Sequence, residues 1–313
     1  MPIIPGETSR DSAGLLEQGA MAFAASVPTR PADDGLFGPR SVTWRLTGSM
    51  TTPVTGIRAL LLQALHPLAM AGVDQHSAWR TDPGARLAST SAYEVTVGVG
   101  DTAAASAAAA RVRKIHSFVK GTDPATGRPY AAGDPALLLW VHNALVDSTV
   151  ACTRLYGSIS DGDADRYVRE QVAAAELIGI PADLAPRTVA ELAAYFEAIR
   201  PALTCTPAAA SATSYLLDYV DQAGLGEDDD PESAQLWQDI MDAAIAALPD
   251  WAITLYAEQV PAIAEARERF GEMSASAQLA VRQSLGVLDA VFLGEPGVLE
   301  ARQRLQRRIR AAQ

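Results

Sequence analysis

The sequence predicts an all-α protein organised as a single large helical domain. Hydrophobic residues make up 49% of the 313 residues and aromatic residues only 6%, and alanine is abundant. Alanine stabilises helices, whereas strands favour aromatic and β-branched residues. The chain is also long enough to bury a substantial hydrophobic core. Packed helices are therefore the expected architecture.

Charge and cysteine content narrow the class of protein. The formal net charge of -12 argues against a nucleic-acid binder, which needs a basic surface. Cys152 and Cys205 cannot form a disulfide framework and lie in no CxxC motif. The N-terminus lacks a secretory leader and no uncharged apolar run reaches about 18 residues, so we expect a cytoplasmic protein without a transmembrane helix. Contact with a membrane surface stays open.

Prolines and apolar runs predict the positions of the first helices. A short helix is expected over residues 12–25, followed by a turn-rich segment over 26–40 that contains several Pro and Gly residues. The apolar run 57–73 predicts a buried helix that is kinked at Pro67. His66 lies directly before that kink, and its simplest interpretation is a core histidine bonded to a backbone group.

Further helix starts are marked by capping residues. Asp82, Asp101 and Asp134 each precede a predicted helix, as N-cap residues do, and another predicted helix has Asp161, Asp163 and Asp165 in its first turn, where acids suit the helix dipole. The fragment 98–103 has GxGxxA form, but no acidic residue follows at the distance that a dinucleotide site needs, so we interpret it as a helix break. The expected elements are helices 83–97, 102–119, 136–156, 160–178, 188–203, 208–223, 232–247, 251–269, 274–293 and 299–311, with a loop or small hairpin over 121–133.

Residues able to carry chemistry gather between positions 66 and 142. All four histidines lie there, as do both lysines: His66, His76, His116, His142, Lys114 and Lys120. Histidine is the commonest metal ligand or proton carrier near neutral pH. This concentration points to one site.

Helical spacing sorts the polar residues of this region into two stripes. The stripes are Arg86, Thr90 and Glu94, at i, i+4 and i+8, and Arg113, His116 and Lys120, at i, i+3 and i+7. Two such stripes on otherwise apolar helices predict an enclosed polar pocket. Alternatively, Arg86 and Glu94 are satisfied by ion pairs or solvent, and a lone histidine such as His142, on a strongly apolar helix, is more often structural.

Several kinds of catalytic site are excluded by missing motifs. The chain has no Glu-x-x-His pair for a di-iron bundle, no HExxH, no Cys/His zinc cluster and no Gly-x-Ser-x-Gly elbow. Haem fits better, because it needs one axial ligand, an apolar helical pocket and cations for its propionates. His116 could be that ligand, with Arg113 and Lys120 near the propionates. One histidine with basic neighbours is nevertheless a weak signal.

Four blocks in order carry a family resemblance. They are Arg86–Thr90, Val112–Gly121, Tyr130–Ala132 and Leu139–Ser148, with a similar upstream block over Leu65–Ser77. Together they resemble the MpaB and latex-clearing-protein family of haem oxygenases over roughly residues 40 to 270. The resemblance implies a globin-like core that holds haem b and iron, and O2-dependent cleavage of an alkene. It divides the chain into an arm and covering loop (1–40), an oxygenase-like core (41–270) and C-terminal helices packed on that core (271–313).

The resemblance also implies roles for single residues. His116 matches the axial iron ligand and Arg113 the arginine one turn before it. Arg86 and Thr90 match the distal R-x-x-K-T element, where they would stabilise charge on bound oxygen. Ser89 stands where the rubber-cleaving members have a lysine. This departure puts polymer cleavage in doubt and leaves haem binding intact.

The remaining predictions concern the rest of the site and the reaction. Lys120 is expected to face a propionate, and His142 to orient His116 or pack below the haem. We expect a haem b-dependent oxidoreductase that uses O2 on a small apolar unsaturated substrate, terpenoid or lipid-like. Ser89 in place of lysine motivates the alternative, a non-catalytic haem or apolar-ligand binding protein. A helical interaction protein without a cofactor is the third possibility.

Overall fold

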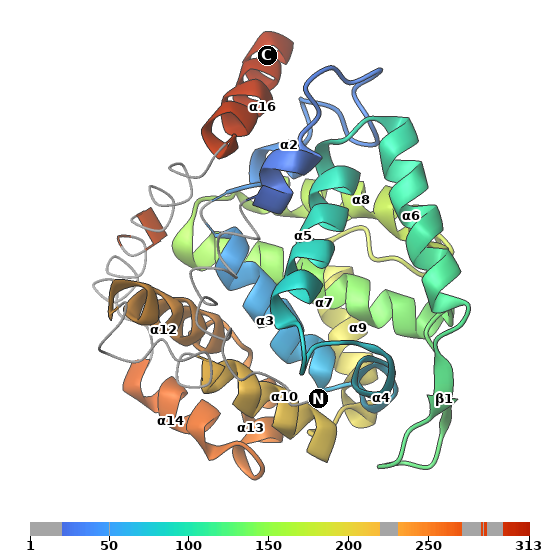
Figure 1. The fold of residues 1–313 in the computed structure, drawn as a ribbon, viewed down its shortest axis with the longest axis vertical. Coiled ribbons are helices and arrows are strands. Elements are labelled where there is room, and N and C mark those ends of the chain that lie inside the picture. Colours follow the sequence, from blue (N-terminus) through green and yellow to red (C-terminus); the bar gives the residue numbers. More distant parts are fainter. Residues whose placement is uncertain (1–20, 50, 220–230, 271–282, 284, 287–296) are drawn as a thin grey trace, which may run out of the picture.

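The structure, a computed structural model, describes residues 21–49, 51–219, 231–270, 283, 285–286 and 297–313. This part of the chain is helical except for one short hairpin, which confirms the all-α prediction (Figure 1). The globin-like arrangement implied by the resemblance stays a prediction. The predicted helix 274–293 lies almost wholly outside the described residues, and of the predicted helix 12–25 only the end is described, where residues 21–26 are helical.

The elements follow one another along the chain with short connections. The α-helices are α2 (Val42–Leu46), α3 (Thr52–Ala64), α4 (Pro67–His76), α5 (Pro83–Val99), α6 (Thr102–His116), α7 (Pro135–Tyr156), α8 (Asp161–Ile178), α9 (Val189–Ile199), α10 (Pro207–Leu217), α12 (Pro231–Ala246), α13 (Asp250–Ala257), α14 (Pro261–Phe270) and α16 (Val298–Ala312), with a 3-10 turn at Arg200–Ala202. Strands β1 (Lys120–Thr122) and β2 (Pro129–Ala131) pair antiparallel, with Gly121 opposite Tyr130. The hairpin lies where the sequence predicted a loop or hairpin.

The core is built around α3 and α7, which pack against each other in the middle of the molecule (Figure 1). Buried aromatic side chains join neighbouring helices to α3 through backbone carbonyls. The Trp140 indole N–H donates to the Gln63 carbonyl at 3.1 Å, and the Tyr256 hydroxyl donates to the Leu61 carbonyl at 2.6 Å. Each aromatic ring thus buries apolar area while its polar atom keeps a partner.

A buried ion pair lies in the same interface. Arg58 of α3 is 3% exposed, and its Nη1 lies 2.8 Å from the Asp147 carboxylate of α7. Nη1 also donates to the Ser148 hydroxyl and Nε to the Ala247 carbonyl, both at 2.8 Å. A buried charge is tolerated when it is paired and hydrogen-bonded in this way. Arg58 therefore ties α3 to α7 and to the end of α12.

The apolar run 57–73 is broken where a kink was predicted. α3 ends at Ala64, α4 starts at Pro67, and the two helices meet at 107°. Proline disfavours helical conformation in the residue before it, and His66 is accordingly extended, at φ -90° and ψ 112°. The carbonyl that the break frees at Leu65 accepts a hydrogen bond from the Thr204 N–H at 2.8 Å. The prediction of one kinked helix was wrong for this reason.

Proline also divides a second predicted helix. The sequence predicted one helix over 251–269, whereas α13 ends at Ala257 and α14 begins at Pro261. Val260, directly before the proline, donates its N–H to the Tyr256 carbonyl at 2.8 Å and ends the turn. Proline cannot continue the hydrogen-bond ladder, so a new helix starts there.

The C-terminal helix α16 lies against the segment that precedes α3. Arg302, Arg304 and Arg308 donate to backbone carbonyls of Gly48, Val27 and Asp33, at 2.5, 3.2 and 3.1 Å. The Arg308 guanidinium also lies 4.5 Å from the ring centre of Trp44. Beneath these contacts is a separate apolar cluster formed by Phe23, Val27, Trp44, Val95, Val99, Val298, Ala301 and Leu305. Helix α16 therefore closes one end of the molecule.

Helix α7 corrects the expectation that no helix could span a membrane. Among the described helices, α7 is the single one that is long enough and apolar enough to cross a bilayer, judged by length and composition alone. Two bent pairs, α3 with α4 and α12 with α13, would raise that number to three if each pair counted as one span. In the folded protein 61% of the most apolar stretch of α7 is buried, largely against α3 and α8. Core packing thus accounts for much of its hydrophobicity.

Candidate functional site

Helix α5 carries the first predicted stripe on one face. The Asp82 side chain accepts the Ala85 N–H at 3.0 Å and so fixes the start of the helix. Arg86 donates to the Thr90 hydroxyl, which itself donates to the Arg86 carbonyl at 3.0 Å. At about 100° per residue, Ser89 falls on the same side of the helix. The side chain of Arg86 therefore lies along its own helix, next to Thr90.

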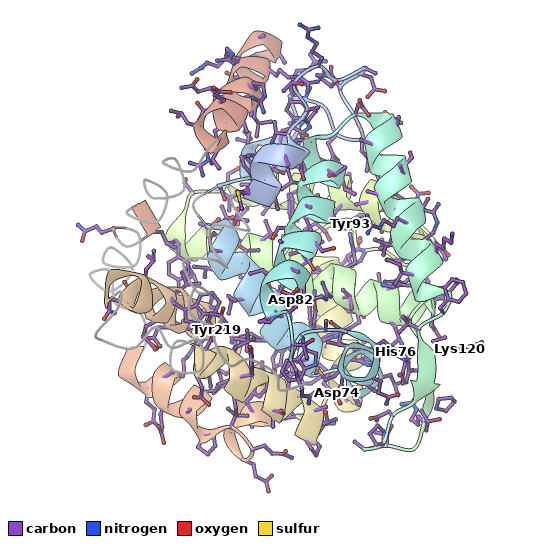
Figure 2. All side chains as sticks on the ribbon, viewed as in Figure 1. Asp74, His76, Asp82, Tyr93, Lys120 and Tyr219 are labelled. Carbon is purple, nitrogen blue, oxygen red and sulfur yellow. The ribbon has the colours of Figure 1, made fainter. Side chains whose placement is uncertain are left out.

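Helix α6 ends at His116, three residues earlier than the sequence predicted. At about 100° per residue, His116 and Arg113 continue the face of the buried Ala105 and Ala109. Lys120 lies beyond the helix end, exposed on β1, and does not share this face. In Figure 2 Lys120 lies on the hairpin at the edge of the molecule, whereas Tyr93 lies on α5 nearer its middle. The second predicted stripe is therefore shortened to Arg113 and His116.

His116 has an unusual environment for a surface-helix histidine. Its Nδ1 is buried and has no hydrogen-bond partner. Burial lowers the pKa of the imidazole, and the positive charge of Arg86 lowers the pKa further. The ring is therefore neutral at pH 7, and it lies near enough to Arg86 for their charges to interact. The two stripes thus meet across the contact between α5 and α6, as predicted.

Arg86 lies between the helices and solvent. Its side chain keeps exposed surface, yet the loss of surrounding water lowers its pKa, with Glu94 acting in the opposite direction. Neighbouring protein atoms thus surround part of the guanidinium, while the rest stays open to solvent. Arg86 lies close enough to Glu94 and to His116 for their charges to interact, and we refer to the region around these three residues as the candidate pocket.

Glu94 is the acidic member of this pocket. Burial raises the pKa of its carboxyl to about 7, although the positive charge of Arg86 lowers it. Two tyrosines lie close enough to be influenced by Glu94. Burial raises the pKa of Tyr93 to about 12, and it also raises the pKa of Tyr167 on α8, in both cases with a smaller contribution from Glu94. Glu94 can thus exchange a proton near neutral pH.

Sequence reasoning missed the two tyrosines. Tyr93 stands seven residues after Arg86, on the same helical face, so spacing alone could have found it. Tyr167 comes from α8, whose position beside α6 depends on tertiary packing. No local signal could have identified it.

Arg113 is held by a helix end. Its guanidinium donates to the Leu177 carbonyl, in the last turn of α8. The C-terminus of a helix carries partial negative charge and unpaired carbonyls, which suit an arginine. Arg113 therefore fixes the distance between α6 and α8, and its remaining N–H groups are free for a ligand.

Two of the four histidines have structural partners outside this site. His66 caps α4 by accepting the Ala69 N–H at its Nδ1, at 3.4 Å, which confirms its interpretation as a buried histidine bonded to backbone. The His76 Nε2 lies 3.1 Å from the Tyr130 hydroxyl and holds the hairpin against α4. The four histidines therefore do not form a single site.

His142 lies on α7 among apolar residues. Burial alone lowers the pKa of its imidazole to about 4, so the ring is neutral at physiological pH. Its predicted role beside His116 stays a prediction. Ser89, likewise, is exposed on α5 and has no described hydrogen bond.

Other possible sites lie elsewhere or are missing from the described residues. No group of three or more His, Cys, Asp or Glu in the described segments could hold a metal ion. An open hollow of about 440 Å³ is lined by Leu36, Phe37, Arg166, Arg169, Glu170 and Ala173, and contains none of the predicted site residues.

The fold is all-α, and it places His116, neutral and unbonded at Nδ1, beside Arg86, which has lost part of its hydration. These features define a helical protein with a polar site between two helices. Comparison with protein families assigns it more closely. The model described as the ER-bound oxygenase mpaB/B'/Rubber oxygenase catalytic domain matches residues 44–286, which include every predicted site residue. The chain belongs to this oxygenase family, as the resemblance indicated. Comparisons with individual curated proteins and with solved structures found no match.

Proposed function

We propose that this protein is a haem b-dependent oxygenase that uses O2 on a small, apolar, unsaturated substrate, terpenoid or lipid-like, in the cytoplasm. Membership of the oxygenase family supports the reaction class. The single observation that carries the cofactor assignment is the His116 ring, which is neutral, enclosed and unbonded at Nδ1.

The residues of the pocket fit a haem. An iron ligand must be a neutral imidazole, and both burial and Arg86 keep His116 in that form. An unpaired buried polar atom costs about 1–3 kcal/mol, a cost that occupancy of the pocket can offset. Arg113 uses one N–H group on the Leu177 carbonyl and has others left for a propionate. When bound, haem would supply the redox chemistry that activates dioxygen.

The chain's own residues would set the electrostatics of the reaction. Arg86, whose guanidinium donates to the Thr90 hydroxyl, would present a positive charge beside His116, where it can stabilise developing negative charge. The Glu94 carboxyl, with a pKa of about 7, can hold or release a proton at its oxygen atoms.

Ser89 supports the alternative, a non-catalytic haem or apolar-ligand binding protein, because it provides no cation where the rubber-cleaving members have lysine. The Glu94 carboxyl favours catalysis instead, because burial raises its pKa to about 7 beside the positive charge of Arg86. A protein that only stores an apolar ligand has no use for a group that exchanges a proton near neutral pH.

An ultraviolet-visible spectrum of the purified protein tests the cofactor. We expect a Soret band that shifts with carbon monoxide after dithionite reduction, and that is lost in His116→Ala. His76→Ala is the matched control, since it removes a histidine from the hairpin contact and leaves α6 intact. A colourless protein that takes up no added haemin would end the haem proposal. Stoichiometric haem in His116→Ala would instead assign the ligand elsewhere, with His142 as the next variant to examine.

Oxygen consumption separates the oxygenase from the binding protein. Haem-loaded protein should consume O2 in the presence of an unsaturated terpenoid or fatty acid and should not do so with the saturated analogue. Arg86→Gln should retain haem but lose most of this rate, because the positive charge in the pocket is gone. Haem retention without any O2 uptake over a panel of such alkenes would favour the binding protein.

A further inference from the structure

The end of α6 carries the two most exposed large apolar side chains in the described part of the chain. Phe118 is 72% exposed and Ile115 is 51% exposed. The Phe118 N–H donates to the Ile115 carbonyl at 3.0 Å, so the backbone keeps a helical turn between them. Isolated exposed apolar residues are common, but two in adjacent turns form a continuous apolar surface.

Cationic side chains surround these two residues. At about 100° per residue, Arg111 and Lys114 share the outward face of α6 with Ile115 and Phe118, and both are exposed. Lys120 and Arg128 are exposed on the adjoining hairpin. We refer to these six residues, Arg111, Lys114, Ile115, Phe118, Lys120 and Arg128, as the α6–hairpin patch.

Little exposed negative charge lies next to the patch: of the two acidic residues between positions 111 and 134, Asp134 is exposed and caps α7, whereas Asp123 is withdrawn from solvent. Asp123 is the only acidic residue between positions 111 and 128, and it is 2% exposed. Its carboxylate accepts the backbone N–H groups of Ala125 and Thr126 at 3.1 and 3.0 Å. A chain with a net charge of -12 therefore presents a surface that is locally positive and apolar.

The patch is also rigid. The inner face of the hairpin is fixed to α4, because the Tyr130 hydroxyl donates to Gln75 Oε1 at 2.8 Å and Gln75 Nε2 donates to the Thr122 carbonyl at 3.0 Å. The Ala132 N–H donates to the Val119 carbonyl at 2.8 Å and joins the hairpin to the end of α6. A preformed surface loses little conformational entropy on binding.

We propose that the α6–hairpin patch docks on the surface of an anionic phospholipid bilayer. Cations next to a pair of apolar side chains match such a surface, where anionic headgroups lie above the hydrocarbon. His116 follows Ile115 directly and faces the opposite way, toward Arg86. Docking thus brings the candidate site within one helical turn of the membrane surface. An apolar substrate dissolved in the bilayer could then reach the site directly from the membrane. Only this last step rests on the proposed function.

Cosedimentation with lipid vesicles tests the docking and needs neither haem nor substrate. The full chain should bind vesicles with about one-third anionic phospholipid at least tenfold more tightly than zwitterionic vesicles, and salt at about 0.5 M should remove most of the difference. Ile115→Ser with Phe118→Ser, and separately Arg111→Glu with Lys114→Glu, should each reduce binding at least tenfold. Circular dichroism confirms that the variants fold.

Matched controls come from elsewhere on the surface. Leu184→Ser removes an apolar side chain that is 49% exposed, and Arg307→Glu with Arg310→Glu makes the same charge change on exposed positions of α16. Both controls should bind vesicles like the wild-type protein. Absence of vesicle binding, equal binding to neutral vesicles, or equal losses in the controls would overturn the proposal. The proposal would also be overturned if the patch substitutions changed the molar mass of the protein in solution but left vesicle binding unchanged, because the patch would then bind a second copy of the chain.

Discussion

Glu94 provides the sharpest quantitative prediction. The pKa of its carboxyl rises from 4.5 to about 7 on folding. The folded protein therefore binds this proton more tightly than the unfolded chain, so its stability falls as pH rises from about 4.5 to about 7 and levels off above that. At about 1.4 kcal/mol per pKa unit, the cost reaches about 3 kcal/mol above pH 8 and is small near pH 4.5. Glu94→Gln, which cannot ionise, removes this dependence.

Urea denaturation at pH 5.5 and pH 8.5 measures the effect. The free energy of unfolding of Glu94→Gln relative to wild type should be higher at pH 8.5 than at pH 5.5 by about 2 kcal/mol. His116 and the other titrating groups are present in both proteins, so their contributions largely cancel. Glu176→Gln, at an exposed position of α8, is the control and should show no such difference. The same relative stability at both pH values, at matched haem content, would refute a desolvated Glu94.

Three further changes probe the fold. Asp147→Leu leaves the buried Arg58 guanidinium without its carboxylate and should cost about 3 kcal/mol in urea denaturation, and a much smaller loss would mean that the hydrogen bonds to Ser148 and Ala247 alone satisfy Arg58. Tyr130→Phe removes the hydroxyl that joins the hairpin to α4, so amide exchange in β1 and β2 should accelerate by roughly a factor of five, with α7 unchanged. Gly35 has φ +68°, and an added Cβ would lie 1.9 Å from the Gly100 carbonyl oxygen; Gly35→Ala should therefore lower the melting temperature, whereas Gly127→Ala, in open space at φ +68°, should lower it less.

The helix starts could be predicted because their signals are local. The Asp82, Asp101 and Asp134 side chains each accept an N–H of the first helical turn, as the sequence indicated. Ser160 does the same for α8, where the sequence had indicated the acids of the first turn instead. The positions at which helices end were harder to predict from the sequence. Whether α6 stops at His116 or continues to residue 119 depends on how the following hairpin packs on α4, a contact between distant segments.

The candidate site was predictable only in part. Spacing placed Arg86, Glu94 and His116 on facing helices, and the electrostatic coupling between them agrees with that prediction. Lys120 was grouped with them because helical spacing was extended past the end of the helix. The idea of a single four-histidine site failed because a histidine's partner is set by tertiary structure: the closest partners of His66 and His76 are a backbone amide and a tyrosine.

The contacts of α16 have a consequence for the order in which the protein is made. A ribosome releases residues 27–48 long before α16, and at typical synthesis rates the interval is roughly 10–50 seconds. During that interval the carbonyls of Val27, Asp33 and Gly48 lack their arginine donors, and Trp44 lacks the cover of Arg308. This end of the molecule therefore closes only after translation has passed α16, which lies beyond the family-matched residues 44–286. A nascent chain stalled before α16 would expose the Trp44 cluster to chaperones.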